Sequence, residues 1–81
     1  MKAKIYVTLK SGIHDPQGHA VQQSLETLGF HSVDTVRMGK LLEIDLKESD
    51  QRKAEVAVKS MCEKLLSNPV IEEYRFELSQ A

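Results

Sequence analysis

The sequence KIYVTLKSGIHDPQG, residues 4–18, holds two patterns that together decide the start of the fold. Its first half alternates apolar and polar side chains, which is the period of a strand with one buried face. In its second half, Asp15 can accept hydrogen bonds from the free amides of a new helix, and Pro16 has the fixed φ that suits the first helical position. The stretch therefore predicts a strand followed closely by a capped helix.

The first helix is expected to run from about Pro16 to Leu28. Gly29 suits the left-handed residue that closes a helix. The apolar residues between these ends recur at helical spacing: Ala20, Val21, Leu25 and Leu28.

The stretch from Ser32 to Lys47 is rich in β-branched and aliphatic residues and predicts two strands. The tetrapeptide Arg37-Met38-Gly39-Lys40 interrupts this stretch, so a turn or bulge is expected there. A hairpin is the simplest interpretation.

A second helix is expected after Ser49 or Asp50, either of which can cap it, and it must end before Pro69. A last strand follows, in which Tyr74, Phe76 and Leu78 alternate with charged residues. The predicted apolar stripe of the helix is wide: Ala54, Ala57, Val58, Met61, Cys62, Leu65 and Leu66.

The predicted order is β-α-β-β-α-β, in a single domain that spans residues 1–81. It indicates the α+β class, as a two-layer sandwich of an antiparallel sheet with both helices on one face. The opposite face of the sheet would be polar apart from an aromatic ring: Lys4, Tyr6, Thr8, Glu43, Asp45, Arg75 and Glu77.

The size and charge of the chain limit its partners. A chain of 81 residues buries only about 60 to 65% of its unfolded surface, and a single cysteine excludes an internal disulfide, so self-association is expected.

A net charge of -1 argues against nucleic acid and membrane partners. The acidic LEIDL (residues 42–46) also lacks the aromatic residues of an RNA-binding strand. Without an export signal, we expect a cytoplasmic location.

The candidates for catalysis or metal binding are weak. Cys62 lies within an apolar stripe, which favours a buried structural thiol. His14, Asp15 and His19 are close in sequence, but the capping role of Asp15 competes with metal binding. The chain has no phosphate-binding loop and no convincing nucleophile with its base. We therefore expect no catalytic residue and no bound metal or cofactor.

Two positions are better explained by contacts with other backbone or with a partner. Gly18 near a helix start could admit an anion, although close packing against neighbouring backbone is favoured because Asp15 occupies the same donors. Arg37, Gly39 and Lys40 would display two cations on a tight turn, which suits a carboxylate or phosphate of a partner as well as it suits a solvated turn.

The order and spacing of several segments resemble the PurS family of phosphoribosylformylglycinamidine synthase subunits. The resemblance covers nearly the whole chain. The segments are IYVTLK (5–10), DPQG (15–18), AV (20–21), LG (28–29), VRMGK (36–40) and MCEKLLSNPVIEEY (61–74).

This resemblance implies a role in de novo purine synthesis. A large synthetase subunit would bind ATP, magnesium and substrate, and a glutaminase subunit would release ammonia. The small subunit would join them as a homodimer or homotetramer. On this basis we expect partner contacts or interface shape to depend on nine residues: Asp15, Pro16, Gly18, Arg37, Gly39, Lys40, Asn68, Pro69 and Glu72.

Two alternatives remain open at this stage. A small-molecule sensor of the ACT type shares the β-α-β-β-α-β order and a similar Asp15-Pro16-x-Gly18 joint. A plain oligomeric stability module would also explain the absence of catalytic groups.

Overall fold

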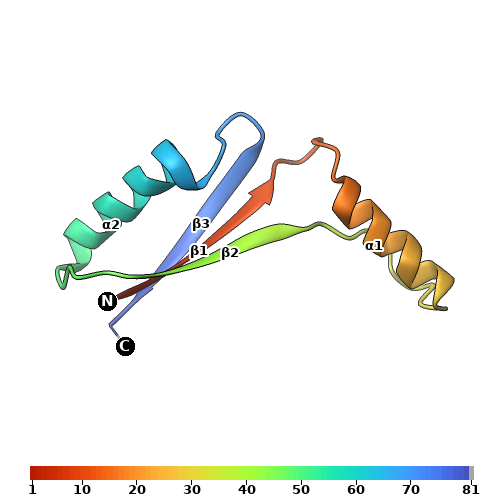
Figure 1. Ribbon diagram of the computed structural model, residues 1–81, viewed down its shortest axis with the longest axis horizontal. Coiled ribbons are helices and arrows are strands. Elements are labelled where there is room, and N and C mark those ends of the chain that lie inside the picture. Colours follow the sequence, from red (N-terminus) through yellow and green to blue (C-terminus); the bar gives the residue numbers. More distant parts are fainter. Residues whose placement is uncertain (81) are drawn as a thin grey trace.

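The computed structural model describes residues 1–80, which form one three-stranded sheet with helices (Figure 1). Both neighbours of β1 run antiparallel to it, in the order β2-β1-β3. Along the chain the elements are β1 (Lys2–Leu9), α1 (Pro16–Thr27), β2 (Gly39–Asp45), α2 (Gln51–Met61), the π-helical turn η1 (Cys62–Leu66) and β3 (Glu72–Ser79). The α+β class and the antiparallel sheet are thus confirmed.

The core lies between the central strand and α2. Ala3, Ile5 and Val7 of β1 are buried because strands flank them on both sides and α2 covers their face. From α2 and η1, Val58 and Cys62 pack into the same cluster. Half-buried residues of the edge strands and of adjacent segments surround it: Leu42, Ile44, Leu46, Leu66, Tyr74, Phe76 and Leu78.

The opposite face of the sheet is polar, as the alternation predicted. The guanidinium of Arg75 lies 3.9 Å from the centre of the Tyr6 ring, directly across the β1–β3 pair. On the other side of β1, Lys4 pairs with Glu43 at 4.0 Å. These contacts link exposed side chains, so each stabilises the sheet only slightly.

Both helices begin at an aspartate cap, and the end of α1 follows the predicted pattern. Asp50 accepts a hydrogen bond from the amide of Lys53 at 3.0 Å. At the end of α1, the Gly29 amide donates to Glu26 and the Phe30 amide donates to Leu25, with a φ of 99° at Gly29. A left-handed glycine with this pair of bonds is the Schellman motif.

Helix α1 lies beyond the end of the sheet and not over its face (Figure 1). Gly18 is its only buried residue. The radius of gyration is 16.1 Å, whereas a compact domain of this length has about 12 Å. The expectation that both helices cover one face of the sheet is therefore corrected, since only α2 does so. We call α1 and the segment that returns from it, residues 16–36, the arm.

The second correction concerns residues 32–38, where a further strand up to about residue 36 and then a turn were predicted. They run back beside α1 towards the sheet and form no strand (Figure 1). The single strand begins at Gly39, which pairs with Thr8 of β1, so Gly39 is not a hairpin turn. A strand needs a hydrogen-bonding neighbour, and the arm offers this segment a helix instead.

Among residues 1–80, no helix combines the length and the apolar character that crossing a bilayer requires.

Replacement of Val58 by alanine should lower the free energy of unfolding by about 2 kcal/mol, because it removes buried methyl groups and leaves a cavity. Val56 of the same helix is 68% exposed, so Val56→Ala should change stability by less than about 0.5 kcal/mol. Urea unfolding at one fixed protein concentration would measure both. Equal losses in the two variants would contradict this assignment of the core.

Candidate partner-contact site

Two segments that contain proline, residues 15–18 and residues 68–71, lie at the same end of the sheet. The first follows the end of β1 and the second precedes β3. Because these strands are antiparallel, Leu9 of β1 is paired with Glu72 of β3. Strand β2 also begins here, since Thr8 is paired with Gly39. We call this end of the molecule the joint. It brings together all nine residues that were predicted from the sequence: Asp15, Pro16, Gly18, Arg37, Gly39, Lys40, Asn68, Pro69 and Glu72.

Asp15 connects the helix with the sheet. Its Oδ1 accepts from the Gly18 amide at 2.8 Å, and its Oδ2 accepts from the Met38 amide at 2.7 Å. The side chain is buried, with the whole residue 6% exposed. These two amide donors lower the pKa of the Asp15 carboxyl, and the charge of Arg37 adds a smaller effect. Asp15 is therefore an ionised structural acceptor at neutral pH.

Gly18 allows the arm to close on itself. A Cβ atom at this position would collide with the carbonyl oxygen of Val36 and would lie 2.8 Å from Oδ2 of Asp15. The expectation of close packing against neighbouring backbone is thus confirmed. Gly39 has a similar role beside the sheet, because a Cβ there would lie 2.8 Å from the carbonyl oxygen of Val7.

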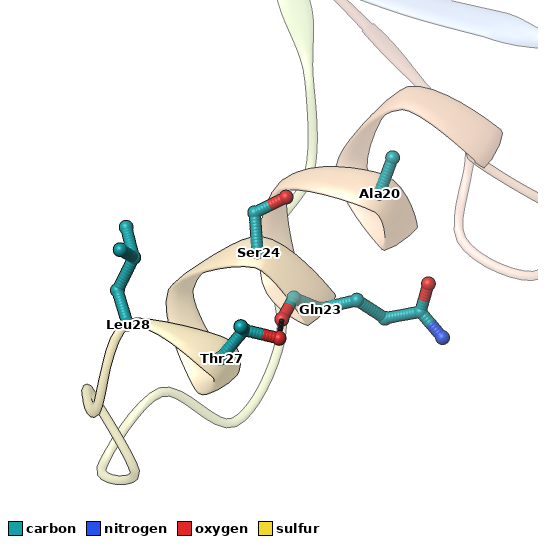
Figure 2. Close-up of a pocket in the computed structure, with 5 residues that line it drawn as sticks. All are labelled: Ala20, Gln23, Ser24, Thr27 and Leu28. Carbon is teal, nitrogen blue, oxygen red and sulfur yellow. Dashed lines mark hydrogen bonds between the residues drawn. The ribbon is translucent and has the colours of Figure 1, made fainter.

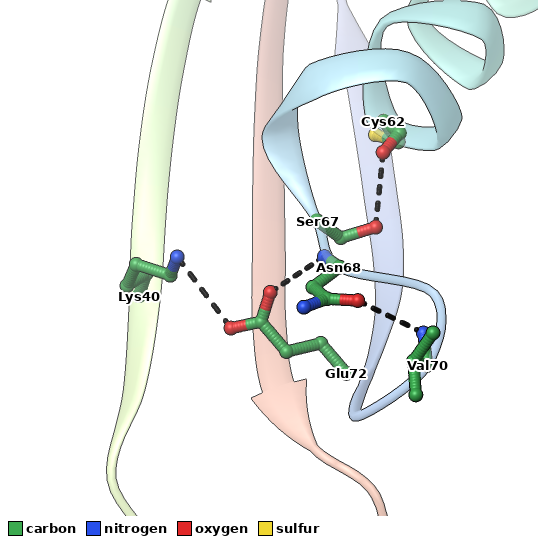
Figure 3. Close-up of polar contacts among 6 residues, drawn as sticks. All are labelled: Lys40, Cys62, Ser67, Asn68, Val70 and Glu72. Atoms are coloured by element: carbon green, nitrogen blue, oxygen red, sulfur yellow. Dashed lines mark hydrogen bonds and ion pairs between the residues drawn. The ribbon is translucent and has the colours of Figure 1, made fainter.

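The second proline-containing segment is a tight turn, which is held by its own side chains and by that of Glu72 (Figure 3). The Asn68 amide donates to Oε1 of Glu72 at 2.7 Å, and the Val70 amide donates to Oδ1 of Asn68 at 3.0 Å. Before the turn, the Ser67 hydroxyl and amide both donate to the Cys62 carbonyl. That carbonyl is thus satisfied where the π-helical turn ends.

An ion pair spans the full width of the sheet at the joint. Nζ of Lys40 on β2 lies 3.5 Å from Oε2 of Glu72 on β3, with β1 between the two strands (Figure 3). The side chain of Glu72 is only 15% exposed, whereas that of Lys40 is 60% exposed. Glu72 is therefore held in place by its neighbours, and Lys40 presents its charge at the surface.

Lys10 connects the two proline-containing segments, and this role was not predicted from the sequence. Its Nζ donates to the Pro69 carbonyl at 2.6 Å and its amide donates to the Ile71 carbonyl at 2.8 Å. Its own carbonyl accepts from Arg37 at 3.3 Å. A lysine at the end of an alternating strand is typical of a solvated position, so no sequence signal distinguished it.

One surface hollow lies at the joint and another lies along α1. One, of about 200 Å³, is lined at the joint by Val7, Leu9, Asp15, Gln17, Met38, Gly39, Lys40 and Glu72. The other, of about 480 Å³, lies along one side of α1 and is lined by Ala20, Gln23, Ser24, Thr27 and Leu28 (Figure 2). Because all five of these residues come from α1 or from its C-cap, Leu28, the second hollow is an uncovered helix face and not an enclosed ligand cavity.

The residues considered for catalysis or metal binding lie in surroundings that favour a structural role. Cys62 is fully buried, and burial together with the charge of Glu63 raises the pKa of its thiol, which disfavours a thiolate. Both carboxylate oxygens of Asp15 are occupied by backbone amides, and the rings of His14 and His19 are 6.3 Å apart. No group of three or more potential metal ligands occurs within residues 1–80.

The chain is similar to known proteins of one family over nearly its whole length. The family model described as PurS, phosphoribosylformylglycinamidine (FGAM) synthase, matches residues 2–80. The phosphoribosylformylglycinamidine synthase subunit PurS of Bacillus subtilis is 49% identical over 79 residues, which cover 98% of this chain and 93% of that protein. The corresponding subunit of Archaeoglobus fulgidus is 43% identical over 74 residues, covering 91% and 92% of the two chains.

Solved structures share the fold. PurS of Methanocaldococcus jannaschii, described as one of the subunits of formylglycinamide ribonucleotide amidotransferase in the purine biosynthetic pathway, has a TM-score of 0.89 at 36% identity and covers 99% of this chain and 96% of its own. A chain of the PurLQS structure from Thermotoga maritima has a TM-score of 0.86 at 34% identity, covering 94% of this chain and 93% of that one.

The stabilising effect of Asp15 should depend on pH. Its folded-state pKa lies below the ordinary value of 3.8, so the ionised carboxylate stabilises the fold above pH 3.8 and this contribution is lost as the pH falls through the folded-state pKa. Asp15→Asn should therefore destabilise the protein at about pH 6, and the difference from the wild type should shrink at about pH 2.5. Urea unfolding at both pH values would measure this. A difference that stays constant would contradict it.

Proposed function

Since the chain belongs to the PurS family of phosphoribosylformylglycinamidine synthase, an enzyme of purine biosynthesis, we propose that it is a non-catalytic subunit that bridges the glutaminase and synthetase subunits. The observation that carries this proposal is the joint. There, polar groups from β2, β3, the start of α1 and the segments next to them converge, and they bind one another and the backbone. Such a site is suited to holding a shape, because its main acceptors are already occupied.

The division of labour in the assembled enzyme follows from this proposal. The synthetase subunit would bind ATP, magnesium and formylglycinamide ribonucleotide, and the glutaminase subunit would release ammonia from glutamine. Ammonia that escapes into water is protonated and diluted. Two separate active sites therefore benefit from a subunit that orients them and excludes solvent between them. In this role the chain needs a rigid surface and no catalytic group of its own.

The joint is the surface that we assign to partner contacts. Arg37 and Lys40 are exposed cations at its rim, while Asp15 and Glu72 behind them hold the backbone in place. An acidic group on a partner would gain a charge-assisted hydrogen bond from either cation. In this proposal, Gly18 and Gly39 determine the local shape, and so do Pro16, Asn68 and Pro69.

The exposed area of the chain supports self-association as a homodimer or homotetramer. The accessible surface is 6048 Å², whereas a compact monomer of 9.1 kDa exposes about 4,900 Å². The excess of roughly 1,100 Å² is comparable to the area of about 800 Å² that each partner buries in a standard interface. Much of the arm is available for this, because Val21, Leu28 and Phe30 are 39%, 71% and 56% exposed.

Reconstitution of the enzyme from its three proteins tests the bridging role. Omission of this chain should abolish most glutamine-dependent turnover, because ammonia would no longer pass efficiently between the two larger subunits. Turnover with ammonium salts in place of glutamine should be reduced much less, since this source bypasses the glutaminase. Full glutamine-dependent turnover in the absence of this chain would contradict the proposal.

Charge reversal gives a matched control within the same assay. Arg37→Glu should raise the concentration of this chain needed for half-maximal turnover by about tenfold or more, since repulsion replaces an ion pair with the partner. Arg52→Glu introduces the same change on α2, away from the joint, and should have little effect. Equal effects of the two variants would remove the joint from the proposed interface.

A further inference from the structure

We propose that Asp15 is a positioning residue that fixes the orientation of the arm relative to the sheet. The carboxylate binds the first turn of α1 with one oxygen and the entry to β2 with the other. Its role in the rigidity of this single chain can be tested without any partner. Its consequence for the enzyme, a preset angle between two contact surfaces, rests on the proposed function.

Within one chain, the arm has few other means of holding its position. It is connected to the sheet by two chain crossings, one at residues 10–15 and the other at residues 37–38, and α1 does not cover the sheet (Figure 1). Within α1, only Gly18 is buried. A helix that projects in this way would pivot about its two connections unless specific contacts at its base prevented it.

The two bonds of Asp15 act on opposite sides of that pivot. The Gly18 amide belongs to the first turn of α1, so the bond to Oδ1 sets the direction in which the helix starts. The Met38 amide directly precedes Gly39, which is paired with Thr8 in the sheet. One buried carboxylate thus joins the start of a helix to Met38, which lies 23 residues away in sequence and directly before β2.

Neighbouring contacts restrict the same region. The close approach of Gly18 to the Val36 carbonyl keeps the two crossings together. Arg37 donates to the Lys10 carbonyl at 3.3 Å, but this bond is exposed and long. The Asp15–Met38 bond is shorter and partly buried, so it should contribute most to the fixed orientation.

The chain offers variants that separate this role from helix capping. Asp15→Asn and Asp15→Ser each keep one oxygen to accept from the Gly18 amide, and both residue types are good helix caps. Neither can reproduce the second bond, because the asparagine nitrogen is a donor facing the Met38 donor and serine has only one side-chain oxygen. Asp50→Asn is the matched control, since Asp50 caps α2 through one local bond to Lys53.

Residual dipolar couplings of backbone amides measure the orientation of α1 relative to the sheet directly. In the wild type and in Asp50→Asn, one alignment tensor should fit the amides of α1 and of the three strands. In Asp15→Asn and Asp15→Ser, the alignment magnitude fitted to α1 should fall roughly twofold below that of the sheet, because the helix now samples several orientations. The Met38 amide should exchange with solvent at least about tenfold faster.

Two results would overturn the proposal. A single tensor that still fits both parts in the Asp15 variants would show that other contacts, within the chain or between copies of it, hold the arm. Loss of α1 helicity in both variants, detected in the backbone chemical shifts of α1, would show that the bond to Met38 supports the helix itself and not its orientation. Neither result depends on the other subunits. An arm that is freed in these variants, combined with full turnover in the reconstituted enzyme, would support the positioning role and count against the use of a preset arm angle in bridging.

Discussion

The carboxylate of Asp15 accepts hydrogen bonds from the amides of Gly18 and Met38, and the shape of the molecule depends on this interaction. It holds the start of α1 against the entry to β2, so the helix projects from the end of the sheet. If α1 instead covered the sheet, the chain would be compact and its apolar residues would be buried within it. The extended shape leaves both the arm and the joint available to other proteins.

In the proposed role, this arrangement would let a small chain contribute to an enzyme without a catalytic group of its own. The core between α2 and β1 is small, and it supports a sheet whose joint end gathers Lys10, Arg37, Lys40 and Glu72. Among these, Lys10 connects the two proline-containing segments through hydrogen bonds that involve backbone carbonyls. Assembly with copies of itself and with larger subunits would cover surface that the isolated chain cannot bury.

The sequence predicted features that depend on neighbours along the chain. Asp15 and Asp50 as caps, Gly29 as the left-handed end of α1, and the two faces of β1 all follow from local chemistry or from the period of a strand. Residues 32–36 were assigned to a strand because β-branched residues favour one. No local pattern shows that the partner of this segment is a helix in the arm.

The sequence pattern also did not predict where α1 lies relative to the sheet. The apolar stripe of α1 predicted that the helix would be covered, but it could not show that the sheet of the same chain does not cover it. The nine joint residues were chosen separately for turn, cap and charge properties, and their meeting at one end depends on the antiparallel register of β1 with both neighbours. Lys10 was missed for the same reason.

In the proposed assembly, the arm of the isolated fold leaves an interface uncovered. Analytical ultracentrifugation of the purified chain over a range of concentrations would reveal whether copies of the chain cover it. We expect a stable species at two or four times the chain mass of 9.1 kDa. A monomer at 9.1 kDa across the whole range would contradict it.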